Sequence, residues 1–191
     1  MYNENELLSL VRERLSDYRY NHSVCVAEKA VELAQKHGAD VKKAYVAGIL
    51  HDITKEDDLI FQQKEIEKAQ MTMTSLEIAN EKVYHQMSGM AFIKNNLAIT
   101  DEDILYAVRY HTTGRANMTL LEMIIYLADF TSADRNYPDV DTMRAKTDKN
   151  LFEGMLYSLS YTIKDLVSKN RQIHPDTLDC YNWVIDNIKG D

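Results

Sequence analysis

The sequence is short of the residues that break up a chain and of those that cross-link it. Its 191 residues include two prolines and six glycines, too few for the frequent turns of a β-rich architecture. The two cysteines, Cys25 and Cys180, lie far apart and form no CxxC pair, which argues against a disulfide framework and a thiolate metal site. Cysteines used as small apolar residues suit a reducing compartment, so we expect a cytoplasmic protein.

Long apolar runs and an excess of positive charge are also missing. The longest runs, such as MIIYLA, are too short to span a bilayer, and MYNENELLSLVRERL at the start lacks the features of a signal peptide. Lys and Arg number 22 against 30 Asp and Glu, which gives a net charge of −8. Such a chain lacks the positive field that binds nucleic acid. We therefore expect neither a membrane nor a nucleic-acid partner, although a locally positive site could bind a small anion.

Helical periodicity extends along nearly the whole chain, without a convincing strand pair or internal repeat. Thr100 and Asp103 resemble a capping box, and Pro175 suits the first turn of a helix. The pattern predicts an all-α fold, a single compact helical bundle. The predicted helices cover about residues 5–16, 22–37, 40–51, 56–69, 85–95, 100–111, 119–132, 148–169 and 175–188.

Four histidines stand at or near predicted helix ends, beside small or apolar residues. They are His22, His51, His85 and His111. Any one histidine is more often an ordinary polar group, so the signal lies in the convergence of several. Asp52 follows His51 directly, and Asp129 lies on the apolar helix face of EMIIYLADFTSA. A carboxylate there is costly to bury alone, so Asp129 reaches solvent, pairs with an arginine such as Arg135, or binds a metal. Imidazole and carboxylate ligands without thiolates select iron, manganese, cobalt, nickel or zinc.

The order of these residues resembles the signature of the HD-domain metal-dependent phosphohydrolases. That signature is a lone histidine, a His-Asp doublet and a distal aspartate, all on helices. The stretches NHSVCVAEKAVELA, AGILHDITKE, YHTTG and YLADFTSADRNYPDVD are similar to the YqeK family of bacterial symmetrical diadenosine tetraphosphate hydrolases. The resemblance covers nearly the whole chain. It implies one HD-type domain over residues 1–191, with a metal-site core at about 18–135 and C-terminal helices at 148–189 packed on it.

The resemblance further implies two divalent metal ions, iron in the first place, and hydrolysis of diadenosine tetraphosphate to two ADP by a hydroxide between them. His22, His51, Asp52 and Asp129 would hold one ion. His85 and His111 would hold the other, with Asp52 as the bridge. The nucleotide would then be a small-molecule partner.

Further residues are candidates for catalysis and substrate contacts. The predicted catalytic residues are Asp52 and Lys55. Lys55 lies one turn after Asp52 and could stabilise the negative charge that develops on the leaving group, but it could equally be solvated. Thr112 and Thr113 could donate to phosphate or only form the turn after a helix. Arg135 could reach the phosphates if its helix ends near Ser132. The predicted substrate-binding residues are His22, Thr112, Thr113, Arg135, Arg171, His174 and Thr177, the last three as the lining of an adenosine pocket or as a plain connector.

Two other functions remain open from the sequence. The chain could be another HD phosphohydrolase, acting on guanosine polyphosphates or nucleoside monophosphates, or a nucleotide sensor that binds without turnover. His85 and His111 favour a dinuclear metal site over a mononuclear one. The complete set of six ligand-type residues argues against a sensor, because a protein without catalytic activity need not retain them. An apolar helix exposed on a compact bundle also favours a homodimer.

Overall fold

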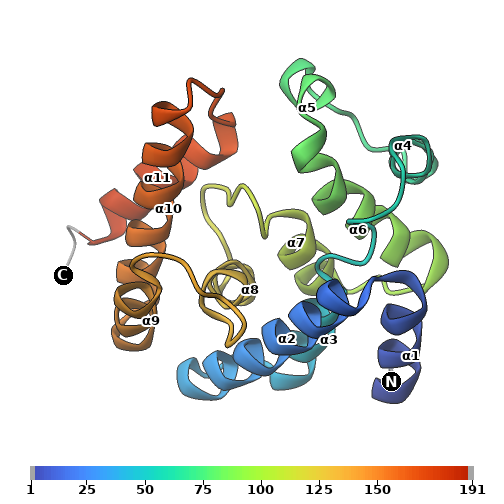
Figure 1. The fold of residues 1–191 in the computed structure, drawn as a ribbon, viewed down its shortest axis with the longest axis horizontal. Helices are drawn as coiled ribbons and strands as arrows, with labels where there is room; N and C mark the ends of the chain where they lie inside the picture. Colours follow the sequence, from blue (N-terminus) through green and yellow to red (C-terminus); the bar gives the residue numbers. More distant parts are fainter. Residues whose placement is uncertain (1–2, 189–191) are drawn as a thin grey trace.

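All regular structure in residues 3–188, the part of the chain that the structure describes, is helical. The computed structural model has eleven α-helices and one short 3-10 helix in this range (Figure 1). The predicted all-α fold is therefore confirmed. In chain order the elements are α1 Glu4–Arg14, α2 Asp17–His37, α3 Val41–Leu50, α4 Leu59–Lys68, α5 Ser75–Ala79, η1 Glu81–Val83, α6 Tyr84–Asn96, α7 Glu102–Arg109, α8 Leu120–Thr131, α9 Val140–Lys149, α10 Leu151–Ser168 and α11 Pro175–Ile188.

Local caps set the boundaries of the helices that carry the site. The Ser16 hydroxyl accepts a hydrogen bond from the N–H of Arg19, so α2 begins at Asp17, well before the predicted start at His22. Gly38 ends α2 in the left-handed conformation with φ 77, as the sequence predicts. The Asp40 carboxylate accepts from the N–H of Lys43 at 3.0 Å and starts α3.

Other predictions of helices and helix ends differ from the structure. The residue that caps α7 is Asp101, which accepts from the N–H of Asp103 at 3.1 Å, so Thr100 and Asp103 form no capping box. The helix predicted over 148–169 corresponds to α10, Leu151–Ser168, whereas the pattern predicts no helix over most of α9, which precedes it. Asn150, with φ −159, separates the two helices and caps α10. Thr74 and Glu77 do form a capping box at the start of α5, a helix that the sequence pattern does not predict.

Helices α2, α3, α7 and α8 pack against one another and form one group, which the other helices flank (Figure 1). Helices α4 to α6 lie on one side of this group, and α9 to α11 lie on the other, with α9 and α10 packed against α8. Fully buried apolar side chains such as Ile49, Ile124 and Ile125 fill the centre. None of the described helices is both long enough and apolar enough to cross a membrane.

Candidate metal centre

Five helices bring the six predicted metal-ligand residues together in the middle of the fold. His51 directly follows α3 and Asp52 comes next, His85 is the second residue of α6, and His111 lies two residues beyond the end of α7. His22 lies in the second turn of α2, and Asp129 lies in the last turn of α8. The first five are at most 3% exposed, and the Asp129 side chain is 19% exposed. Residues up to 107 positions apart in sequence thus share one buried cluster.

The four imidazoles form a row. The ring centroids of His22 and His51 lie 5.2 Å apart, those of His51 and His111 5.0 Å, and those of His111 and His85 4.9 Å. Asp129 lies at the first end, with Oδ1 at 3.0 Å from Nε2 of His22 and 3.9 Å from Nε2 of His51. At the other end Nε2 of His85 lies 3.0 Å from Nε2 of His111.

Hydrogen bonds to Nδ1 fix the tautomer of three of these imidazoles. Nδ1 of His51 lies 2.8 Å from the carbonyl oxygen of Gly48, and Nδ1 of His111 lies 2.7 Å from that of Val108. A carbonyl only accepts, so both Nδ1 atoms carry the proton and both Nε2 atoms keep a lone pair. Nδ1 of His22 lies 2.8 Å from the carboxylate of Asp134. The Nε2 atoms of His51 and His111 are therefore available as metal ligands, and all three imidazoles have the outer hydrogen bond at Nδ1 that is typical of ligating histidines.

The carboxylate of Asp52 faces both ends of the row. Its Oδ2 lies 3.6 Å from Nε2 of His51. Its Oδ1 lies 3.4 Å from Nε2 of His85 and 3.5 Å from Nε2 of His111. One oxygen toward each set of imidazoles is the arrangement that a bridging carboxylate needs.

The donor set fits a metal. Within the described residues, His22, His51 and Asp129 form one group of three candidate ligand atoms, and His51, Asp52 and His111 form another. Nε2 of His51 is buried and has no hydrogen-bond partner among the described residues, which is costly unless something else binds it. Nitrogen and carboxylate oxygen without sulfur suit iron, manganese, cobalt, nickel or zinc.

Electrostatics holds His51 and the two carboxylates in their metal-binding protonation states. Burial lowers the pKa of His51 to about 4, so the imidazole is neutral at pH 7. Burial raises the pKa of Asp52, but His51, His111 and Lys55 outweigh it and hold that pKa well below the ordinary value. For Asp129 the hydrogen bond with His22 and the charge of Arg135 likewise outweigh burial and lower the pKa. Neutral imidazole and ionised carboxylate are the forms that bind metal ions.

Three cationic side chains border the carboxylates. Nη1 of Arg19 donates to Oδ2 of Asp52 at 3.0 Å, and Arg135 donates to both the carboxylate and the carbonyl of Asp129. The end of α8 at Thr131 is what allows Arg135 to turn back toward Asp129, and this ion pair is one of the three outcomes expected for that carboxylate. Nζ of Lys55 lies 2.8 Å from Nε2 of His85 and 3.8 Å from Asp52, and burial lowers its pKa.

Five of the predicted substrate-binding residues line one cavity of about 480 Å³ at the His85 end of the row. They are Thr112, Thr113, Arg171, His174 and Thr177. The Thr112 hydroxyl lies 3.1 Å from Nε2 of His85, which joins the cavity to the row. The two other residues predicted to bind substrate, His22 and Arg135, lie at the opposite end, 3.3 Å apart.

Several of these groups also have structural partners. The backbone N–H groups of Thr112 and Thr113 both donate to Oε1 of Gln86 at 3.3 Å, so Gln86 already occupies the donors that phosphate was expected to use. The Thr177 hydroxyl donates to the carbonyl of Thr113 at 2.9 Å. Nδ1 of His174 accepts from the N–H of Asp176 at 3.1 Å, at the start of α11.

Sequence reasoning missed the residues that support the cluster from outside. These are Arg19, Gln86 and Asp134, which contact Asp52, Thr112 and His22. Asp134 was within reach of prediction, because it directly precedes Arg135 in a motif already singled out. Arg19 and Gln86 carry no signal of their own in a helical pattern.

Comparisons with known proteins agree with this geometry. The family described as "HD domain" matches residues 19–134. A symmetrical bis(5'-nucleosyl)-tetraphosphatase of Bacillus subtilis is 38% identical over 183 residues, which cover 96% of this chain and 98% of that protein. One from Halalkalibacterium halodurans is 37% identical, with 96% and 97% covered.

A solved structure has the same fold. It is that of a predicted HD superfamily hydrolase involved in NAD metabolism from Clostridium acetobutylicum, with a TM-score of 0.94 and 33% sequence identity, covering 98% of this chain and 99% of that one. The resemblance expected from the sequence is thereby confirmed: the chain belongs to the HD domain family.

Proposed function

We propose that this protein hydrolyses diadenosine tetraphosphate symmetrically and releases two ADP. The observation that carries the proposal is the buried row of four imidazoles with two carboxylates, which faces a cavity of about 480 Å³ at its His85 end. The names of relatives that match the chain over nearly its full length support the same activity. A cation-lined, buried cluster beside a cavity suits an anionic nucleotide better than a neutral substrate.

In this proposal His22, His51, Asp52 and Asp129 would hold one divalent ion, and His85 and His111 would hold a second, to which Asp52 would also contribute. Iron is the first candidate, and manganese, cobalt, nickel and zinc suit the same donors. When bound, two such ions supply a hydroxide nucleophile at neutral pH and withdraw charge from the phosphoryl oxygens.

The chain's own residues position the polyphosphate. Arg135 and Arg19 lie at the two carboxylates and attract phosphate oxygens to the row. Lys55, beside His85 and Asp52, balances the charge that develops on the departing ADP. The nucleoside of one half enters the cavity that Arg171 and His174 line. Phosphoryl transfer needs mainly this kind of positioning and charge stabilisation.

The test is an assay of iron-loaded protein, prepared without oxygen, with three separate substrates. These are diadenosine tetraphosphate, guanosine tetraphosphate and AMP, with products resolved by chromatography. ADP as the sole product of the first substrate supports the proposal, and AMP plus ATP from it would reject symmetrical cleavage. Preferred turnover of a guanosine polyphosphate or of AMP supports another HD phosphohydrolase. Tight binding without turnover supports a sensor, and metal-free protein is the control.

A further inference from the structure

A second cavity opens at the end of the imidazole row that is farthest from His85. Its volume is about 260 Å³, and its lining comprises Asp129, Phe130, Arg135, Tyr137 and Tyr161. Two of these residues belong to the candidate metal centre, since Asp129 lies 3.0 Å from Nε2 of His22 and Arg135 pairs with Asp129. The row therefore has a cavity at each end, this one beside His22 and the larger one beside His85.

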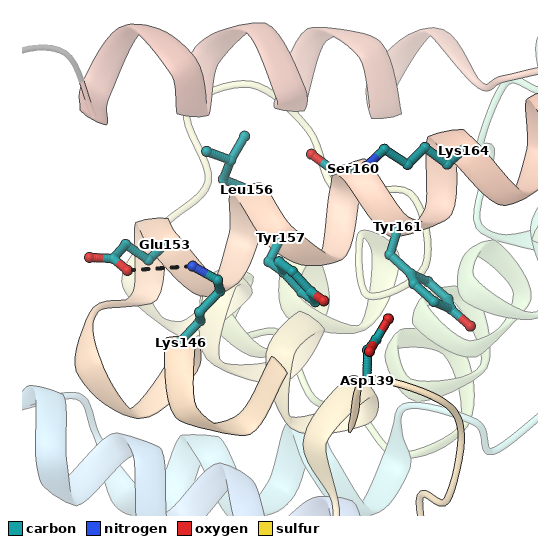
Figure 2. A pocket seen from close by; sticks show the side chains of 8 residues that line it. All are labelled: Asp139, Lys146, Glu153, Leu156, Tyr157, Ser160, Tyr161 and Lys164. Carbon is teal, nitrogen blue, oxygen red and sulfur yellow. Dashed lines mark ion pairs between the residues drawn. The ribbon is translucent and has the colours of Figure 1, made fainter. Parts of the chain in front are cut away.

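The smaller cavity has aromatic walls. The rings of Tyr137 and Tyr161 have centroids 5.5 Å apart and are tilted by 39°. The Tyr137 hydroxyl donates to the carbonyl of Phe130 at 2.8 Å, which holds that ring in place. Tyr161 projects from α10 on the side where Asp139 lies (Figure 2) and is 36% exposed. Aromatic faces of this kind bind nucleobases by stacking.

Helix α10 separates the two cavities. Tyr161 lines the smaller one, whereas Thr162 and Leu166 line the larger one. A dinucleotide cut between its two central phosphates has one nucleoside on each side of the reacting bond. Two cavities that flank one cluster of cationic and metal-type groups match that symmetry.

We propose that the cavity of Phe130, Tyr137 and Tyr161 binds the second nucleoside of the substrate, with Tyr161 stacking on its base. This inference rests on the proposed function. The volume of about 260 Å³ is small for a whole ligand and suits one planar group.

The charged side chains beyond Tyr161 balance one another. A neighbouring cavity of about 380 Å³ shares Tyr161 and is lined by two carboxylates, Asp139 and Glu153, and two ammonium groups, Lys146 and Lys164 (Figure 2). Lys146 in that cavity is already paired with Glu153. These charges balance, so the region lacks the excess positive charge that would draw the polyphosphate away from the row.

The test compares Tyr161→Leu, Tyr161→Phe and unaltered protein, all metal-loaded. Tyr106→Leu is the matched control, because Tyr106 is also 36% exposed and lines neither cavity. Two quantities are measured: kcat and KM for diadenosine tetraphosphate, and the inhibition constant of adenosine 5'-tetraphosphate. That competitor has all four phosphates but one nucleoside, which takes the larger cavity.

For Tyr161→Leu we expect KM for the dinucleotide to rise by about tenfold, from the loss of one base-stacking contact. We expect kcat and the inhibition constant of the tetraphosphate to stay unchanged. Tyr161→Phe keeps the ring and should behave like the unaltered protein, as should Tyr106→Leu. An unchanged KM in Tyr161→Leu, or an equal loss of affinity for the tetraphosphate, would overturn the inference. Failure of the proposed function is separate, because the unaltered protein would then release no ADP.

Discussion

The contact between α2 and α3 gives a sharp test of how the fold positions the metal centre. Gly48 lies where α3 crosses α2, and a Cβ added there would lie 2.8 Å from Cα and 3.2 Å from N of Ala27. Both are backbone atoms, which cannot rotate away as a side chain can. In the Gly48→Ala variant the two helices must therefore move apart.

The expected cost follows from two opposing effects. Overpacking of this kind costs about 1–3 kcal/mol, and contact with backbone places Gly48→Ala in the upper part of that range. Replacing glycine by alanine inside a helix returns about 1 kcal/mol. The net loss of unfolding free energy should be about 1–2 kcal/mol, which lowers Tm by about 2–8 °C in a domain of this size.

The activity of this variant should fall by more than its loss of stability alone would cause. The carbonyl of Gly48 holds Nδ1 of His51, and His22 lies on the partner helix α2. A shift of α3 against α2 therefore changes the separation of two metal-type residues, and small misplacements of reacting groups are costly. Activity measured at a temperature where the variant is fully folded reports the effect of this displacement on the metal centre, separately from unfolding.

The matched control is Gly89→Ala on α6. Its Cβ would lie 3.3 Å from Cγ1 of Val108, the tip of a side chain that can adjust, and no backbone atom lies closer than 3.6 Å. We expect an unchanged or slightly higher Tm for this variant. Thermal unfolding followed by circular dichroism compares the two. A Gly48→Ala protein as stable as Gly89→Ala would refute the reasoning.

Three other predictions address the site itself. In His85→Ala we expect most hydrolysis to be lost and one metal ion fewer per chain by elemental analysis, with cooperative unfolding retained; unchanged turnover would contradict a two-metal site. In Asp134→Asn we expect activity to fall by about 10–100-fold because Asp134 orients His22; steady-state kinetics with an unaltered Tm would separate this role from folding. In metal-free protein we expect stability to fall as the pH is lowered, because folding lowers the pKa of His51 from 6.5 to about 4. The contribution of this group to the free energy of unfolding is complete above pH 6.5 and is lost as the pH falls toward 4. The share from His51 should be a loss of about 2 kcal/mol of unfolding free energy between pH 7 and pH 5, measured by urea unfolding. The lowered pKa of His85 acts in the same direction and the raised pKa of His22 in the opposite one, and a gain of stability toward pH 5 would contradict the burial of neutral imidazoles.

The fold class could be predicted because helical periodicity is a property of each segment alone. Boundaries were less accessible where a single polar residue decides them. Asn150 separates α9 from α10 by adopting an extended conformation, and no glycine or proline marks that boundary in the sequence. Asp101 displaces Thr100 as the cap of α7 because either residue could accept the first N–H bonds, and the sequence does not rank them.

The convergence of the six metal-type residues could be predicted from their types and order, through the His-Asp doublet and the family resemblance. The residues that support these six through hydrogen bonds could not be predicted, because their roles depend on contacts between distant segments. His22 meets Asp134 across 112 positions, and Arg19 meets Asp52 across 33. The two cavities likewise depend on where α10 packs, which no local pattern states.

The placement of histidines at helix ends explains how a helical bundle can hold this row at all. The last four carbonyls of a helix lack partners within it. Gly48 is in the last turn of α3 and Val108 is in the last turn of α7, and each carbonyl accepts from the histidine three residues later. The helix end thus supplies both the position of the imidazole and the acceptor that fixes its tautomer. His85 lies at a helix start, where no such carbonyl exists, and the Lys55 ammonium lies against its ring instead. Burial is the main reason that the pKa of His85 lies well below the ordinary value. The Lys55 ammonium lowers that pKa further, because an ammonium only donates and therefore binds His85 only while the imidazole is neutral and can accept.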